Sequence, residues 1–114
     1  MKTGLWLLAT AIVLGAFGAH GLQALVTPER LETWDTAVRY HAWISLFLLA
    51  IARTSFQTSD WVYRLVVLGL SVFSGSLYLL VLFDAPLLGA ITPIGGILMI
   101  AGIVTAAITC RSLD

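Results

Sequence analysis

The stretch Thr27–Arg53, TPERLETWDTAVRYHAWISLFLLAIAR, begins with charged residues and ends in an apolar run without a break between them. Thr27 is a suitable N-cap, Pro28 suits the first helical position, and Glu29 favours the positive end of the helix dipole. No glycine or proline interrupts the residues after Pro28. The sequence therefore predicts one continuous helix, whose amphipathic first turns lie at a membrane surface and whose remainder crosses the membrane.

Arg39 lies near the middle of this stretch. The uncharged part that follows it, Tyr40–Ala52, covers 13 residues. This is about 20 Å of helix, against a hydrocarbon core of about 30 Å. Arg39 is therefore expected at membrane depth, where an arginine is costly unless it is paired. Asp35 stands one turn earlier on the same face and Glu32 one turn before that, so we expect Arg39 to be buried between helices and held by one of them.

The composition indicates an integral membrane protein. Of the 114 residues, 60% are hydrophobic and 11% are charged, whereas soluble domains are about 45 to 50% apolar. The formal net charge is zero, so no basic surface is available for phosphates and nucleic acid is not an expected partner. Cys110 is the single cysteine, and the two histidines, His20 and His41, show no HExxH spacing. No metal site and no cofactor are expected.

Four apolar segments in a single domain of residues 1–114 predict an all-α fold, an integral membrane four-helix bundle. The expected spans cover residues 4–26, 36–53, 62–83 and 87–110. The first span follows Lys2 and resembles a signal peptide, but it is long and is expected to be retained. In the fourth span Pro93 is expected to kink the helix, because proline removes a backbone donor and crowds the carbonyl of Gly89.

The distribution of basic residues predicts the orientation of these spans. Four spans place both termini on one side of the membrane, together with four basic residues, against two on the other side: Lys2, Arg53, Arg64 and Arg111 against Arg30 and Arg39. The excess of Lys and Arg favours cytoplasmic termini. Trp34, Tyr40 and Trp43 are expected at the headgroup level of the opposite, outer side.

Small residues at helical spacing indicate where helices approach closely in lipid. Such positions are Ala11, Gly15, Ala19, Ser71, Gly75, Gly95 and Gly96. Polar and helix-breaking residues, in contrast, are expected to converge on the outer half of the bundle. This candidate polar cluster comprises His20, Asp35, Arg39, Tyr40, His41, Ser74, Ser76, Tyr78, Thr92 and Pro93. It has two interpretations, since intramembrane polar residues either bond helices together or form a functional site.

Three segments in combination, LGAFGAHGL at 14–22, FSGSLY at 73–78 and ITPIGG at 91–96, resemble the YgdD/YwdK-like family of small bacterial membrane proteins. The resemblance extends to TAVRY at 36–40 and covers nearly the whole chain. The family is catalogued as a domain of unknown function, so it implies a four-helix architecture and a bacterial inner (plasma) membrane location, but no reaction. One departure concerns a histidine: the family pattern places it where this chain has Ile44, while His41 lies one turn earlier. This departure disfavours a mechanism based on histidine.

The sequence leaves two functions open. The first is a non-enzymatic accessory or scaffold subunit that acts through helix association with lipids, with other membrane proteins or with itself. The alternative is a small-solute or proton pathway through the polar cluster, with Arg39 as an anion or counter-ion site and the break at Pro93 exposing backbone carbonyls. An enzyme is not expected, because no nucleophile and base are suitably spaced.

Overall fold

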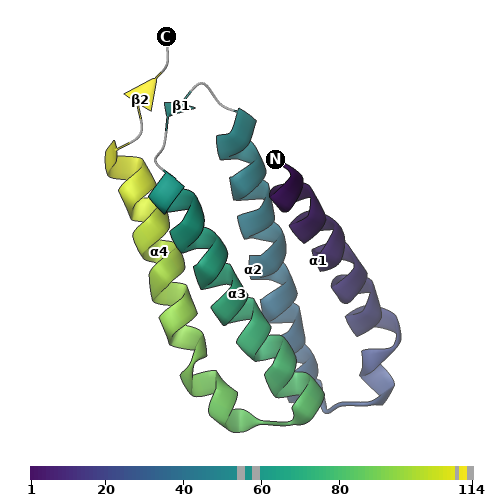
Figure 1. Ribbon diagram of the computed structural model, residues 1–114. Coiled ribbons are helices and arrows are strands. Elements are labelled where there is room, and N and C mark those ends of the chain that lie inside the picture. Colours follow the sequence, from purple (N-terminus) through teal and green to yellow (C-terminus); the bar gives the residue numbers. More distant parts are fainter. Residues whose placement is uncertain (54–55, 58–59, 110, 113–114) are drawn as a thin grey trace.

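The computed structural model describes residues 1–53, 56–57, 60–109 and 111–112. The chain forms α1 (Lys2–His20), the 3-10 helix η1 (Leu22–Ala24), α2 (Pro28–Arg53), α3 (Asp60–Phe83), the 3-10 helix η2 (Pro86–Ala90) and α4 (Thr92–Thr109). Two short strands, β1 (Phe56–Gln57) and β2 (Arg111–Ser112), pair in antiparallel fashion. Figure 1 shows both termini at the same end of the molecule. We call the opposite end, residues 21–30 and 83–92, the turn end.

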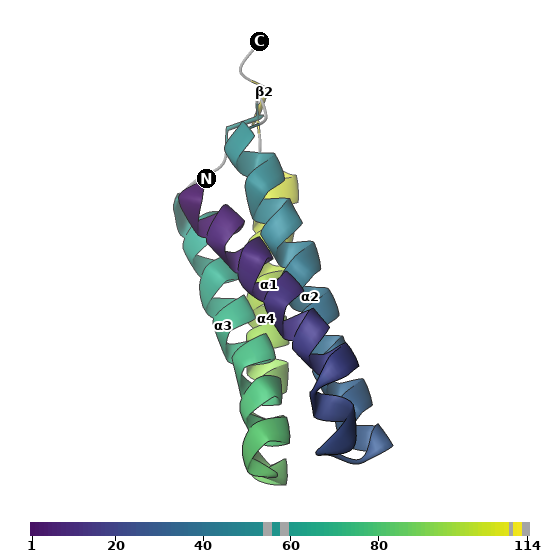
Figure 2. The same ribbon diagram turned by 90° about the vertical axis from the view of Figure 1, so that its right-hand side faces the viewer.

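The four long helices form an open row. Among the described residues, extensive packing joins only consecutive long helices, α1 with α2, α2 with α3 and α3 with α4. Figure 1 shows this order from right to left, and Figure 2 shows α2 and α3 staggered on either side of α1. The principal dimensions of the molecule are 52 × 26 × 17 Å. The all-α prediction is confirmed, but the expected bundle is not closed. α1 and α4 stand at the two edges, where their exposed apolar residues can be covered by lipid as well as by protein.

The prediction of one continuous helix in the deciding stretch is confirmed. α2 has 26 residues, which corresponds to about 39 Å. The hydroxyl of Thr27 accepts a hydrogen bond from the backbone N–H of Arg30 at 3.3 Å, as expected of an N-cap. The buried residues of α2 recur every three or four positions, at Trp34, Ala37, His41, Ile44 and Leu48. This spacing places one face of α2 against α1 and α3.

The expected kink at Pro93 is wrong. α4 begins at Thr92, so Pro93 lies in its first turn, where the missing N–H has no intrahelical partner to lose. The irregular backbone lies just before it, in the 3-10 helix Pro86–Ala90. Within the expected fourth span of residues 87–110, residues 87–90 belong to the 3-10 helix and residues 92–109 to α4.

The contact between α1 and α2 is organised around Trp34, which was expected at the headgroup level. Its side chain is instead 1% exposed, and its Nε1 donates a hydrogen bond to the carbonyl of Leu14 at 2.9 Å. A Cβ at Gly18 would lie 2.6 Å from Cδ1 of this ring. Trp34 is buried because Gly18 leaves room for the indole and the Leu14 carbonyl satisfies its donor.

The small residues of α1 pack along a different line from the expected one. Ala11 is buried and Gly15 lies close to Val38, but Ala19 is exposed. The buried glycines of this helix are Gly4 and Gly18. The face of α1 that contacts α2 therefore differs from the expected one. Large side chains of α2, Leu49 and Trp34, lie against Gly4 and Gly18, and only glycine can accommodate them at these two levels.

The backbones of α3 and α4 approach each other closely at two glycines. A Cβ at Gly95 would lie 2.6 Å from the carbonyl oxygen of Gly69, and a Cβ at Gly69 would lie 2.8 Å from that of Gly95. The expected positions Ser71 and Gly75 face elsewhere: Ser71 is exposed, and a Cβ at Gly75 would meet nothing within 4 Å. Gly96 stands at the margin of the contact, with ordinary van der Waals spacing to the Phe73 ring.

Three segments of the described chain are long and apolar enough to cross a membrane: Lys2–His20, Asp60–Phe83 and Pro86–Thr109. α2 is not among them, because its first half carries charged residues. It nevertheless runs beside α1 from the level of Gly4, which lies against Leu49, to the level of Gly18, which lies against Trp34.

Candidate functional site

The buried members of the expected polar cluster bond the helices to one another. The Nδ1 of His41 and the hydroxyl of Tyr78 form a hydrogen bond of 2.9 Å between α2 and α3. Ser74 donates to the carbonyl of Ala37 at 2.9 Å across the same contact. Ser76 and Thr92 share a hydrogen bond of 2.6 Å between α3 and α4. These hydroxyls therefore have partners, and each bond fixes the position of one helix against the next.

The second ring nitrogen of His41, Nε2, differs from these groups in its hydrogen bonding. His41 is 5% exposed and its ring lies near the main chain of Leu7 in α1, but its Nε2 makes no hydrogen bond within the described residues. A proton pathway through the His41–Tyr78 pair would require a further donor or acceptor at this nitrogen. No described side chain supplies one, and the adjacent Ser45 hydroxyl donates to the carbonyl of His41 instead.

The charged members of the cluster, Asp35 and Arg39, lie on the opposite face of α2, together with Glu32, the second expected partner of Arg39. Glu32, Asp35 and Arg39 are all exposed, so the expectation that Arg39 is buried is wrong. Among the described residues, Arg39 forms no ion pair with either carboxylate. The reason is helical geometry. Ala37 and His41 both point into the row, and Arg39, two residues from each, points away from it.

The depth of Arg39 can be read from the helix that packs beside it. Ser74 bonds the carbonyl of Ala37, and the ring of Tyr40 packs on that of Phe73 with centroids 4.9 Å apart. Arg39 therefore lies at the level of Ser74. Ser74 is the midpoint of Leu65–Phe83, the uncharged run of α3. An exposed cation stands beside the centre of an apolar span.

Two aromatic residues continue the exposed face of α2. Tyr40 and Trp43 pack edge to face with centroids 5.1 Å apart, and Trp43 is 56% exposed. We call Glu32, Asp35, Arg39 and Trp43 the outer stripe of α2. The remaining expected members lie apart from it: His20 is exposed in the last turn of α1, and Pro93 is exposed at the start of α4. The structure thus divides the expected cluster into a buried ladder of hydrogen bonds and an exposed charged stripe.

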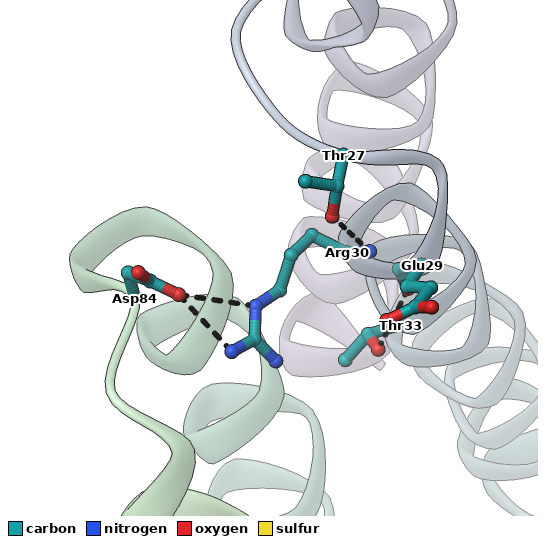
Figure 3. Close-up of polar contacts among 5 residues, drawn as sticks. All are labelled: Thr27, Glu29, Arg30, Thr33 and Asp84. Atoms are coloured by element: carbon teal, nitrogen blue, oxygen red, sulfur yellow. Dashed lines mark hydrogen bonds and ion pairs between the residues drawn. The ribbon is translucent and has the colours of Figure 1, made fainter.

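Sequence reasoning missed an ion pair at the turn end. Nε and Nη2 of Arg30 donate to Oδ1 of Asp84 at 3.2 and 3.0 Å (Figure 3). Asp84 follows α3 with φ of 49°, and the N–H of Ala85 donates to the carbonyl of Leu80 at 3.1 Å. This is a Schellman C-cap, a position that favours glycine or asparagine. The sequence signals the end of α3, but it does not show that Arg30 lies within reach of Asp84.

A cavity of about 540 Å³ opens beside this pair. Its walls are mainly apolar side chains from the ends of α1 and α3 and from the loop between α1 and α2, and its polar lining includes Thr27, Arg30 and Asp84. An apolar wall with charged groups at one side suits part of an amphiphile. No three His, Cys, Asp or Glu side chains of the described chain gather where they could hold a metal ion.

Comparison with known proteins shows the family of the chain. Residues 14–96 match the family model described as "Protein of unknown function (DUF423)". A UPF0382 membrane protein of Staphylococcus saprophyticus is 46% identical over 95 residues, which are 81% of this chain and 79% of the relative. The UPF0382 membrane protein YwdK of Bacillus subtilis is 40% identical over 109 residues, 86% of each protein. No solved structure shows significant similarity. The chain therefore belongs to the DUF423 family of bacterial membrane proteins of unknown function, as the likeness of its motifs to the YwdK-like proteins indicated.

Proposed function

We propose that this protein is a non-enzymatic, multi-pass membrane protein that acts by associating with protein inside the membrane, through the outer stripe of α2. One observation carries the proposal: Arg39 is exposed at the level of the midpoint of the apolar run of α3. A charge in that position is a functional residue by default, since it is costly to place against lipid.

We further propose that α2 is a fourth crossing. α1 and α3, between which it packs, are both apolar enough to span a membrane. α2 runs beside α1 over nearly the whole length of that helix, so it occupies the same depth. Its charged first half would then enter the bilayer. The excess of Lys and Arg on the side of the termini supports cytoplasmic termini in the bacterial inner membrane.

The energy of an unpartnered Arg39 supports a protein partner. An arginine at the centre of a spanning helix costs about 2.5 to 3.5 kcal/mol on insertion scales. Bending the side chain toward the headgroups lowers this cost. However, Asp35 and Glu32 stand on the same exposed face and would also contact lipid or its headgroups. A partner that presents an acidic group to Arg39 and a basic group to one of these carboxylates would remove the paired charges from lipid.

The alternative function, a solute or proton pathway, has less support. Its expected route consists of hydroxyls that already bond neighbouring helices, and the His41–Tyr78 pair has no described continuation at Nε2. The cavity beside Arg30 and Asp84 lies at the turn end and does not extend along the helices.

Site-specific photocrosslinking in intact membranes tests the proposal. A photoreactive residue at Trp43, on the outer stripe, is expected to form adducts with protein, which appear as a shift in mass. The matched control is Ile100 on α4, which is 63% exposed but has no charged neighbours on its face. Arg39→Leu should abolish the Trp43 adduct. The proposal fails if Trp43 crosslinks only to lipid, or if its protein adduct is indifferent to Arg39.

A further inference from the structure

We propose that the partner of the outer stripe is a second copy of this chain, packed α2 against α2 about a two-fold axis along the membrane normal. This inference rests on the proposed function and names its partner. Most soluble and many membrane oligomers use such isologous contacts, in which one surface patch binds itself. A patch can do so only if its charges are self-complementary.

Asp35 and Arg39 of the outer stripe meet this requirement, whereas Glu32 is left outside the pairing. Asp35 and Arg39 carry opposite charges one turn apart on one exposed face. When two α2 helices lie side by side in parallel, Arg39 of each copy stands about 6 Å along the axis from Asp35 of the other. Side chains in a helix slant toward its N-terminus, which for Arg39 is the direction of the partner's Asp35. The two-fold axis therefore generates two reciprocal Arg–Asp pairs.

An ion pair between Asp35 and Arg39 of the same copy would not remove these charges from lipid. Asp35 and Arg39 have the favourable i,i+4 order for such a pair, yet the described structure contains none between them. A pair formed within one helix would also remain on the exposed face. Pairing between copies instead encloses both charges between two helices, where each charge faces a partner in place of lipid and the exclusion of water strengthens the attraction.

The rest of the exposed face permits close packing of two copies. Toward the termini the charged residues are followed by Trp43, Leu46 and Ala50, which recur at helical spacing and are all exposed. Trp43 supplies a large aromatic surface of the kind that is enriched at protein contacts.

Charge exchange tests the inference. In a Glu32→Gln background, which removes the third charge of the stripe, Asp35→Arg gives a stripe with two arginines and Arg39→Asp gives a stripe with two aspartates. Neither variant should pair with itself, and each should lose more than about tenfold in self-association, since like charges across an interface cost several kcal/mol. The two variants expressed together should pair with each other. The double variant, Asp35→Arg with Arg39→Asp, should pair with itself, although less well because its arginine slants away from the opposite aspartate.

Pairing is measured by crosslinking Leu46→Cys with a short thiol reagent in membranes, with Cys110→Ser as background and different tags on the two copies. Leu46 is 53% exposed on the same face as the stripe, and Ile97→Cys on α4, 65% exposed, is the matched control position. Crosslinking at Leu46 in either charge-matched combination, but not in the single variants alone, supports the two-fold contact.

Failure of both charge-matched combinations overturns the second copy as the partner, as does equal crosslinking at the control position. The proposed function is judged separately. If charge exchange fails while the Trp43 photoadduct with another protein still depends on Arg39, association stands and only the identity of the partner is wrong. If the photoadduct is also absent, both proposals fail.

Discussion

The indole of Trp34 occupies the space that a side chain at Gly18 would fill, because a Cβ there would lie 2.6 Å from Cδ1 and 2.8 Å from Nε1. The same ring donates to the carbonyl of Leu14 and packs at 4.7 Å, centroid to centroid, on the ring of Tyr78. Trp34 thus joins α1 to α2 and α2 to α3. The open row depends on this residue near its turn end.

We expect Gly18→Ala to destabilise the protein by about 1 to 3 kcal/mol, since the added methyl must displace a ring that is packed on every side. Gly75→Ala is the matched control, because a Cβ there meets nothing within 4 Å. In a helix interior this control should be neutral or stabilising by about 0.5 to 1 kcal/mol. Thermal unfolding of both variants in the same detergent measures the difference, and equal melting temperatures would contradict the packing described.

We expect alanine substitutions at the adjacent glycines Gly95 and Gly96 to have different effects on the contact between α3 and α4. Gly95→Ala places a methyl about where the backbone of Phe73 lies, and backbone cannot move aside as a flexible side chain can. Gly96→Ala meets only the edge of the Phe73 ring at ordinary distance. We expect the first variant to separate the helices and increase the accessibility of cysteines placed in the contact, and the second to behave as the wild type. Similar labelling of the two variants would show that the glycine seam is not required.

The His41–Tyr78 bond should contribute to stability in the membrane. Tyr78→Phe removes the hydrogen-bond partner of Nδ1 of the buried His41, and an unsatisfied buried polar group costs about 1 to 3 kcal/mol. Tyr40→Phe is the control, since the hydroxyl of Tyr40 has no hydrogen-bond partner among the described residues. Chemical unfolding in mixed micelles should give a lower midpoint for the first variant alone. If the two variants unfold together, the hydrogen bond contributes nothing.

Asp84 has two opposing effects on stability: its ion pair with Arg30 is stabilising, and its positive φ is unfavourable for a residue other than glycine. Asp84→Asn keeps a residue that tolerates positive φ but removes the charge, so only the ion pair with Arg30 is lost, a change of about 0.2 to 1 kcal/mol for an exposed pair. Asp84→Gly loses the same pair but relieves the backbone strain. We therefore expect the glycine variant to melt at or above the asparagine variant. A cycle with Arg30→Gln measures the coupling, which should shrink in high salt, and a coupling unaffected by salt would contradict an exposed pair.

The sequence by itself determined the helices and the class of the protein. The N-cap at Thr27 and the uninterrupted residues after it were sufficient for α2, because capping and backbone propensity act within a few residues. Composition indicated the membrane, and the motifs at residues 14–22, 73–78 and 91–96 indicated the family. The position of Pro93 in the first turn of α4, in contrast, depended on where the preceding 3-10 helix ended.

Only the tertiary structure decided which way each helix faces. Trp34 turned inward and Arg39 outward, and the close contact uses Gly69 with Gly95 in place of Ser71 with Gly75. In water, burial of apolar residues would mark the inner face, but in lipid the outer face is equally apolar and the hydrophobic pattern loses this information. The rotation of these helices is then set by steric fit and by hydrogen bonds between residues far apart in sequence, such as Trp34 with Leu14 and Ser76 with Thr92. Such contacts do not exist until the helices have come together.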